Sequence, residues 1–289
     1  MTYSEWYGEY LTLYKRKIAD KTRECYTRLH TLISPVIGDM DLAAITPDDV
    51  QRALLAVEDQ SGSRQAQLAY ALMHAVMRRA YRSRRVQFNP VDGVDKPEHE
   101  PVKGRAILGD DWNKLLPAIC SDVGFALMAF AGLRRGEALG LQRGDIDFKQ
   151  GVIHVRRQKL RVAGRVTLCE PKSSAGVRDV PLDLDPRLRD ILQAHTRLMT
   201  PNALVCPCAA ETLSGRWRAA QEAAGIEKPY RLHDLRHTCA TRMIAAGYSV
   251  KVVQYVIGHA SYQLTVDTYT HIGIQHALEE VSRLKIALH

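Results

Sequence analysis

The stretch from Tyr230 to His271 reads YRLHDLRHTCATRMIAAGYSVKVVQYVIGHASYQLTVDTYTH and combines helical patterns with side chains that bind phosphate. His233 and Arg236 are three positions apart, so they project from one face of a helix that begins near Leu232. A guanidinium offers forked donors that match the oxygens of a phosphate. This pair therefore indicates a phosphate site, although an HxxR pair is more often a solvated face or a helix cap.

The same stretch holds an imidazole and a phenol further along. His259 directly follows Gly258, and Tyr269 comes ten positions later. A phenol can act as a covalent nucleophile, and no clear set of metal ligands accompanies it. The combination suggests phosphoryl transfer to tyrosine, provided that the rest of the chain supplies a second arginine and an acid.

A motif near the middle of the chain supplies both, because residues 131–141 read AGLRRGEALGL. Arg134 is the further guanidinium, and Glu137, three residues later, can orient it. Gly132 and Gly136 allow a sharp turn and the close approach of a large ligand. In isolation the pair is better explained as a surface ion pair at a helix junction.

The segment after this motif has the composition of β structure. Residues 152–155 and 166–168 are β-rich runs separated by residues 159–164, which predicts a hairpin between them. A turn at residues 170–176 carries Lys172, whose long amine could reach a substrate. Lysines on turns are usually only solvated, so the role of this one depends on the neighbouring motifs.

The remaining part of the second half has mostly helical spacing. Helices are expected at residues 110–119, 122–131, 185–199, 213–224, 232–246 and 250–257, and a short edge strand at residues 178–182. After Tyr269 an apolar stripe predicts an amphipathic terminal helix, formed by Ile274, Ala277, Leu278, Val281, Leu284 and Leu288. This helix could pack on its own domain or on a neighbouring copy.

The N-terminal third is predicted to be all α. Residues 3–15, 21–32 and 61–85 have helical periodicity, and Thr46 is the expected N-cap of a further helix that has Pro47 in its first turn. The last of these helices is expected to end in five arginines within eight positions: Arg78, Arg79, Arg82, Arg84 and Arg85. Such a cluster favours contact with DNA phosphates, with a solvated surface as the alternative.

Length and composition limit the classes of protein to consider. The 289 residues are enough for two domains, and 46% hydrophobic with 25% charged residues is typical of a globular protein. The N-terminus has no signal-peptide pattern, and no run approaches the roughly 18 apolar residues of a membrane span. We therefore expect a cytoplasmic protein with no membrane partner.

The net charge of +8 is concentrated in one part of the chain. Residues 1–100 hold fourteen basic and fourteen acidic side chains, which leaves 26 basic and 18 acidic ones in residues 101–289. An excess of that sign attracts polyanions, and DNA or RNA is the expected partner.

The six cysteines are scattered, which suits a reducing compartment. Cys206 and Cys208 are the only close pair, and no second pair stands at zinc-ribbon spacing, so we expect a structural or incidental role and no metal site. The patterns GxGxxG, GxxxxGK[ST] and HExxH do not occur, which argues against nucleotide-driven and zinc-protease chemistry.

Taken together, AGLRRGEALGL, the Lys172 turn, HDLRHT, IGHAS and DTYTH stand in an order that resembles the tyrosine recombinase (phage integrase) family. With the patterns above, this resemblance predicts a mainly α fold with a small antiparallel β-sheet in the catalytic domain (α+β) and an all-α N-terminal core-binding domain. Because Trp6 already lies in the first predicted helix, the chain resembles a two-domain member without an arm-binding domain. The expected domains are residues 1–88 (core-binding), 89–106 (linker) and 107–289 (catalytic, with the terminal helix).

The resemblance implies a role for each matching residue. The positions that match the family's catalytic residues are Arg134, Lys172, His233, Arg236, His259 and Tyr269, and Glu137 matches the acidic residue after the first arginine. Tyr269 is the expected nucleophile, and Tyr262 is the competing candidate. Attack by Tyr269 would form a 3′-phosphotyrosyl bond that conserves the energy of the broken diester. Neither ATP nor a metal nor another cofactor is therefore expected.

The resemblance also implies a function. We expect a site-specific recombinase that integrates or excises a phage or other mobile element at double-stranded DNA attachment sites. The alternatives are a cellular Xer-like recombinase that resolves chromosome dimers, a type IB topoisomerase, and a non-catalytic DNA-binding protein of the same fold. Exchange between two duplexes needs four strand cleavages, so the resemblance implies a homotetramer on DNA, with an accessory directionality factor as a further expected partner.

Overall fold

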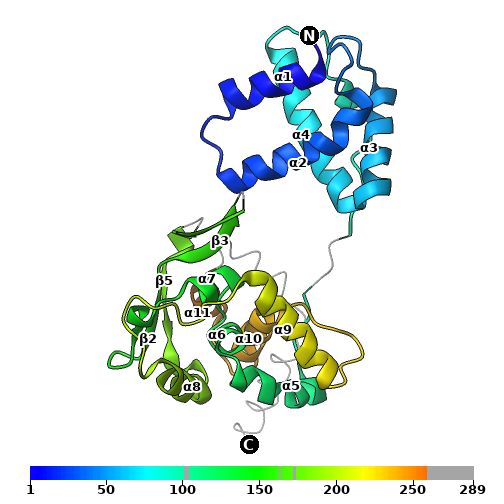
Figure 1. Ribbon diagram of the computed structural model, residues 1–289. Coiled ribbons are helices and arrows are strands. Elements are labelled where there is room, and N and C mark those ends of the chain that lie inside the picture. The colour runs from blue at the N-terminus through cyan, green and yellow to red at the C-terminus, as the bar shows by residue number, and fades with distance from the viewer. Residues whose placement is uncertain (101–103, 163, 172–173, 259–289) are drawn as a thin grey trace, which may run out of the picture. The chain divides into compact units, whose positions relative to one another are not determined.

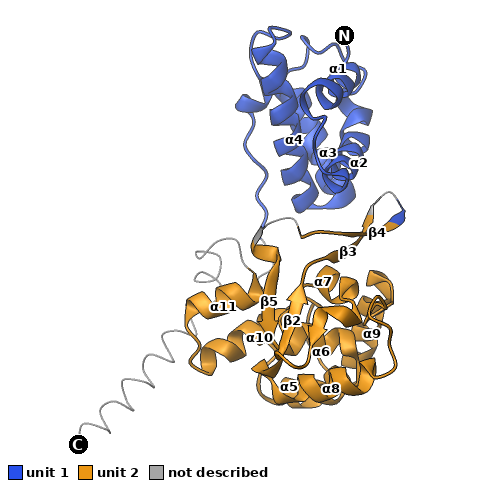
Figure 2. Ribbon diagram, turned by 90° about the vertical axis from the view of Figure 1, so that its left-hand side faces the viewer, with its two compact units in different colours: residues 1–102, 162–165 blue, residues 103–161, 166–289 orange. Residues whose placement is uncertain are grey.

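The computed structural model describes residues 1–100, 104–162, 164–171 and 174–258 (Figure 1). Its contacts divide the chain into two compact units, residues 1–102 with 162–165 and residues 103–161 with 166–289 (Figure 2). Each unit has its own hydrophobic core. The prediction of a mainly α protein with small antiparallel β structure is confirmed. Within the described ranges, no helix is long and apolar enough to cross a membrane.

The first unit is built from helices. They are α1 (Tyr3–Glu9), a π-helical turn (Tyr10–Tyr14), α2 (Asp20–Ile37), α3 (Pro47–Ser61), α4 (Ser63–Arg82) and a 3-10 turn (Pro90–Gly93). The predicted N-cap of α3 is confirmed, because the Thr46 hydroxyl accepts from the backbone N–H of Asp49 at 3.3 Å. The Asp49 carboxylate in turn accepts from the Thr46 backbone N–H at 2.9 Å. These reciprocal bonds satisfy two of the orphan donors at the helix start.

The prediction of one helix over residues 61–85 is wrong at both ends. Helix α3 continues to Ser61, and Gly62, with φ of +84°, separates it from α4. At the other end α4 stops at Arg82, and the backbone N–H of Arg85 returns to the carbonyl of Ala80 at 2.9 Å. Arg84 and Arg85 therefore follow the helix. Arg84 has φ of +55°, the left-handed conformation that glycine usually adopts when a helix ends in this way.

The second unit surrounds one apolar helix. Its helices are α5 (Gly109–Ser121), α6 (Val123–Phe130), α7 (Arg135–Gly140), α8 (Pro186–Thr196), α9 (Ala210–Ala223), α10 (Asp234–Ala245) and α11 (Val250–Ile257), with 3-10 turns at Arg143–Asp145, Ser174–Gly176 and Leu182–Leu184. Every residue of α6 is buried, and α5, α8 and α10 pack against it (Figure 1). The unit's core therefore lies around α6.

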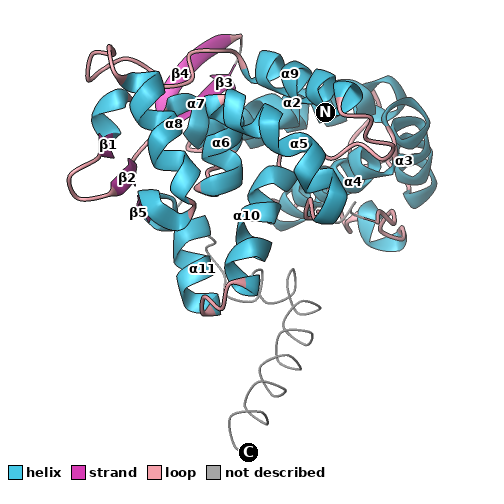
Figure 3. Cartoon of the chain, turned by 90° about the horizontal axis from the view of Figure 1, so that it is seen from below, coloured by secondary structure: helices cyan, strands magenta, loops and turns pink. Residues whose placement is uncertain are grey.

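The strands of the second unit form two sheets, which Figure 3 shows in magenta. In the first sheet β2 (Val152–Val155) lies between β1 (Ile146–Asp147) and β5 (Arg178–Pro181), antiparallel to both. The second sheet pairs β3 (Gln158–Val162) with β4 (Arg165–Cys169). The predicted pairing of residues 152–155 with 166–168 is wrong, because part of the expected loop is itself strand β3. Its sequence, QKLRV, lacks the apolar run that signals a strand, and pairing with β4 supplies the backbone hydrogen bonds instead.

The core of the first unit extends into the segment that the sequence predicts as a linker, residues 89–106. Val91 and Val94 are buried in the core of the first unit, and Pro90 begins a 3-10 turn there. Ile107, directly after this segment, is fully buried in the core of the second unit. The predicted terminal helix falls within residues 259–289, outside the described residues.

Candidate active site

Four of the predicted site residues lie in the described part of the second unit. Arg134 immediately precedes α7, Glu137 is in its first turn, His233 is the N-cap residue of α10, and Arg236 is in the first turn of α10. Lys172, His259, Tyr269 and the competing Tyr262 lie outside the described residues.

Arg134 and Glu137 are held together at the start of α7. The carboxylate of Glu137 accepts from the backbone N–H of Arg134 at 2.8 Å and from its Nη1 at 2.7 Å. The side chain of Glu137 is only 2% exposed, whereas that of Arg134 is 36% exposed. The carboxylate is therefore enclosed, and part of the guanidinium remains open to a ligand.

A second arginine, Arg178 on β5, binds the other side of the same carboxylate. Its Nη1 and Nη2 donate to the two oxygens of Glu137 at 3.2 and 2.9 Å. Burial by itself raises the pKa of Glu137, but the hydrogen bonds and charges of Arg178 and Arg134 outweigh burial and lower the pKa to about 2. Glu137 is therefore ionised at neutral pH.

Arg236 is buried, with 2% of its surface exposed. Its Nη1 donates to the carbonyl of Gly132 at 2.6 Å, and its Nη2 donates to the carbonyl of Ile257. Gly132, two residues before Arg134, has φ of +64°, and an added Cβ would lie 2.5 Å from Cδ1 of Ile257. Arg236 thus stabilises the turn at Gly132, which positions Arg134.

Three guanidiniums meet the last carbonyls of α11. Arg178 Nε donates to Val256 at 2.6 Å, Arg236 Nη2 donates to Ile257, and Arg134 Nη2 donates to Gly258 at 2.5 Å. The C-terminal carbonyls of a helix lack internal partners and form the negative end of its dipole, so cations stabilise them. The three arginines of the site therefore lie together at the C-terminal end of α11, and His259 is the next residue in the sequence.

Glycine is required at position 258. It caps α11 with φ of +68°, in the left-handed region. A Cβ at this position would lie 2.8 Å from the carbonyl oxygen of Ala175 and 3.0 Å from Nε of Arg178. A larger residue would push the end of α11 away from the arginine.

The loop that carries His233 is pinned to α9. The indole of Trp217 donates to the carbonyl of Tyr230 at 3.0 Å, and the side chain of Gln221 bonds both the N–H and the carbonyl of Tyr230. Desolvation, with the positive charges of Arg236 and Arg231 nearby, lowers the pKa of His233 to about 4. The imidazole is therefore neutral at pH 7 in the free protein and can accept a proton.

The second unit has a groove of about 650 Å³, which extends from Arg134 to His233. Arg134 and His233 line it together with further basic and aromatic side chains, namely Arg135, Arg218, Arg231 and Trp217. Among the described residues, no acidic side chain lines the groove. A surface of this kind attracts a phosphodiester backbone.

Sequence reasoning missed Arg178 and the extra groove arginines. A signal for Arg178 was present in its strand, because β5 alternates buried and exposed residues and Arg178 shares the buried register with Val180. A charged residue at an inward strand position needs a partner, which here is Glu137. Arg218 on α9 and Arg231 before α10 had no local signal, because these two elements come together only in the fold.

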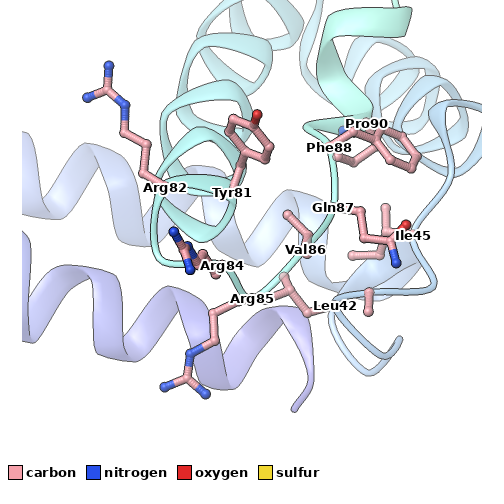
Figure 4. Close-up of a pocket in the computed structure, with 11 residues that line it drawn as sticks. Leu42, Ile45, Tyr81, Arg82, Arg84, Arg85, Val86, Gln87, Phe88 and Pro90 are labelled. Atoms are coloured by element: carbon pink, nitrogen blue, oxygen red, sulfur yellow. The ribbon is translucent and has the colours of Figure 1, made fainter.

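The five clustered arginines at residues 78–85 of the first unit have different surroundings. Arg78 is exposed, whereas Arg79 stacks on the ring of Tyr14, with Cζ 3.8 Å from the ring centroid. Arg82, Arg84 and Arg85 line an open hollow of about 790 Å³, whose wall includes the exposed aromatic residues Tyr81 and Phe88 (Figure 4). Figure 4 shows the guanidiniums of Arg82 and Arg85 extending from the rim in different directions.

The close cysteine pair lies in the second unit, with Sγ atoms of Cys206 and Cys208 3.6 Å apart. Burial raises the pKa of Cys206 to about 12, so this thiol is protonated at neutral pH. Within the described ranges, no group of three or more His, Cys, Asp or Glu side chains could hold a metal ion.

Two family descriptions match the chain. Residues 111–276 match the phage integrase family, and residues 3–96 match the phage integrase central domain. The prophage phiRv2 integrase of Mycobacterium tuberculosis is 31% identical over 274 residues, 88% of this chain and 72% of that protein. The tyrosine recombinase XerC 2 of Ralstonia nicotianae is 30% identical, over 68% of this chain and 57% of that protein.

Solved structures share the fold. The Tn1549 transposon integrase in complex with transposon right end DNA superposes with a TM-score of 0.81 over 99% of this chain and 100% of that one, at 22% identity. A lambda integrase tetramer bound to a Holliday junction gives a TM-score of 0.69 over 90% of this chain and 78% of that one, at 20% identity.

Proposed function

The chain belongs to the phage integrase family, and from this premise we propose that it is a site-specific tyrosine recombinase that cuts and rejoins DNA. Its role is to integrate or excise a phage or other mobile element. The observation that carries the proposal is the pair Arg134 and Arg236, anchored on the consecutive carbonyls of Gly258 and Ile257 beside a basic groove.

The described residues suit stabilisation of a charged phosphate. Arg134 presents a partly open guanidinium, while its carboxylate partner Glu137 is enclosed and already bound by two arginines. Fixed positive groups that face a developing negative charge lower the barrier of phosphoryl transfer. The match to the family's motifs, rather than exposure, supports the same role for the buried Arg236 and for His259.

The reaction needs one nucleophile and two proton transfers. The hydroxyl of Tyr269 would attack phosphorus and form a 3′-phosphotyrosyl bond, while the bond to the 5′ oxygen breaks. His233, neutral because its pKa is lowered to about 4, would take up the tyrosine proton, and Lys172 would protonate the departing 5′ oxygen. Attack by a 5′-hydroxyl of another strand reverses the step, so no cofactor is consumed.

The first unit would bind the DNA duplex through its arginine cluster, Arg78, Arg79, Arg82, Arg84 and Arg85. Arg84 supports this proposal most directly, because it occupies a left-handed helix cap where glycine carries no steric cost. Backbone strain at a non-glycine residue is often retained where the side chain has a function. Arg79 would contribute less, since its guanidinium already stacks on Tyr14.

The assembly follows from the chemistry. Exchange between two duplexes requires four strand cleavages, and one tyrosine serves each, so we expect a homotetramer on paired attachment sites. An accessory directionality factor would select integration or excision. The six free cysteines suit a reducing compartment, which supports a cytoplasmic location for the protein.

A suicide substrate tests the proposed function. A duplex with a nick beside the cleavage site loses its short 5′-hydroxyl fragment after attack, so a covalent protein–DNA adduct accumulates. We expect wild-type protein and Tyr262→Phe to form this adduct and Tyr269→Phe to form none. Tight binding of the duplex by wild-type protein without any adduct would instead indicate a non-catalytic DNA-binding protein.

The similarity to a XerC protein supports a second candidate, resolution of chromosome dimers. Recombination assays with DNA that flanks the gene and with a dimer-resolution site separate the two roles. Joined products from the flanking DNA alone support the integrase. Relaxation of a plasmid that carries neither site would favour a type IB topoisomerase.

A further inference from the structure

We propose that Arg178 is a positioning residue of the active site, which keeps Arg134 directed at the scissile phosphate by holding Glu137 and the end of α11 together. The proposal rests on the proposed function, cleavage of DNA at this centre. The side chain of Arg178 is only 1% exposed and does not line the groove. Its three guanidinium nitrogens all donate to protein groups, so its effect on the reaction passes through the groups it binds.

One guanidinium joins two elements that are distant in sequence. Arg178 Nε donates to the carbonyl of Val256 at 2.6 Å, while Nη2 and Nη1 bind the carboxylate of Glu137 at 2.9 and 3.2 Å. The guanidinium is a rigid planar fork, so these bonds set the position of α7 relative to the end of α11. Lysine carries a single ammonium and cannot reproduce both sets of contacts.

Arg134 binds the same two elements on its other side. Its Nη1 donates to Glu137 at 2.7 Å and its Nη2 donates to Gly258 at 2.5 Å. Arg134 and Arg178 therefore form a closed frame with Glu137 at one corner and the C-terminus of α11 at the other. Without Arg178, Arg134 would be the only arginine of this frame that connects Glu137 to the C-terminus of α11.

The charges of the frame lead to the same conclusion. Two arginines and one carboxylate sum to one positive charge, which remains available to a phosphate. Without Arg178, the sum of Arg134 and Glu137 is zero, and the carboxylate has no other described ion-pair partner to share. Arg178 thus maintains the positive potential at Arg134 without contacting DNA.

Single-turnover cleavage of the suicide substrate, with DNA affinity measured separately, tests the proposal. We expect Arg178→Met and Arg178→Lys to bind the duplex like wild type and to cleave about 100-fold more slowly, the loss typical of a misplaced catalytic group. If Arg178→Met does not fold, Arg178→Lys, which keeps the charge, carries the test. A folded Arg178→Lys that cleaves at the wild-type rate overturns the proposal.

The control is another buried carboxylate of the second unit that has two arginines beside it. The buried carboxylate of Asp185 binds Arg187 at 2.6 Å, and Arg242 lies 3.8 Å away. Arg187→Met therefore also removes one of two arginines from a buried carboxylate. We expect it to lower the unfolding temperature and to leave the cleavage rate per folded molecule unchanged. Equal slowing in Arg187→Met and Arg178→Met would mean that general destabilisation explains both.

A double-variant cycle separates positioning from stability. In a Glu137→Gln background the charge that Arg178 balances is absent, so Arg178→Met should slow cleavage much less than it does in wild type. Additive losses would contradict the proposal, since residues that do not interact give additive effects. Wild-type protein that forms no adduct would refute the proposed function instead, whereas wild-type adduct with unaffected Arg178 variants refutes only this inference.

Discussion

Arg236 donates a hydrogen bond from Nη1 to the carbonyl oxygen of Gly132 at 2.6 Å, although 104 positions separate the two residues. This bond joins the first turn of α10 to the turn that precedes Arg134. The same turn passes so close to Ile257 that only glycine fits. The two predicted catalytic arginines, Arg134 and Arg236, are therefore linked through one turn. Their relative position depends on the absence of a side chain at Gly132.

Gly132→Ala is expected to lower the free energy of unfolding by about 2 to 4 kcal/mol, because the alanine must adopt a left-handed φ and overpack against Ile257. Cleavage of the suicide substrate should fall as well. Urea unfolding and single-turnover rates measure the two effects. The control is Gly215→Ala in α9, where the added Cβ meets open space. The free energy of unfolding of Gly215→Ala should rise by roughly 0.5 to 1 kcal/mol. Equal losses in both variants would contradict the packing explanation.

Glu137 makes the protein's stability sensitive to acid. Its pKa is about 2 in the folded protein, below the ordinary value of 4.5, so the unfolded chain takes up the proton first as the pH falls. The carboxylate's contribution, on the order of 3 kcal/mol, is complete above about pH 4.5 and is lost progressively towards pH 2.

Glu137→Gln should therefore show a flatter decline of stability over that range, in urea titrations at a series of pH values. The exposed Glu222→Gln serves as the control and should keep the wild-type slope. A wild-type slope in Glu137→Gln would mean that another group causes the acid sensitivity.

His233 should titrate near pH 4 in the free protein. Desolvation and the neighbouring arginines disfavour its charged form, so the unfolded chain binds this proton at a higher pH and the residue weakens folding as the pH falls from 6.5 to about 4. NMR titration of the imidazole protons, assigned with His233→Asn, measures the pKa. Addition of DNA should raise it, because a phosphate favours the imidazolium. A midpoint of 6.5 in the free protein would remove the basis for a neutral proton acceptor.

Arg84→Gly is expected to stabilise the protein while it weakens DNA binding. Glycine adopts the left-handed conformation at position 84 without steric strain, which raises the free energy of unfolding by about 1 kcal/mol. The loss of the guanidinium removes one phosphate contact. The dependence of affinity on salt should fall by about one unit of slope. The exposed Arg52, paired with Asp49 at 2.5 Å, provides Arg52→Gln as a control that should keep the wild-type slope. Unchanged affinity and slope in Arg84→Gly would exclude this arginine from the DNA interface.

Local patterns were sufficient for much of the fold. Thr46 and Asp49 were recognisable as a helix start because a capping box depends on residues three positions apart. The spacing of Arg134 and Glu137 likewise indicated their contact, since an N-cap residue and the residue three positions later meet at a helix start. Periodicity identified the mainly α class for the same reason. Strand β3 was missed because its pairing with β4, rather than its composition, makes it a strand.

The sequence by itself determined the class of fold, most of the helices, the family and the residues expected to carry the chemistry, because each of these depends on spacing along the chain. Only the tertiary structure decided that Arg178, Arg236 and Arg134 bind the successive carbonyls of Val256, Ile257 and Gly258. The physical reason is that the end of a helix leaves carbonyls without partners, and which side chains satisfy them depends on elements that folding brings together from distant positions.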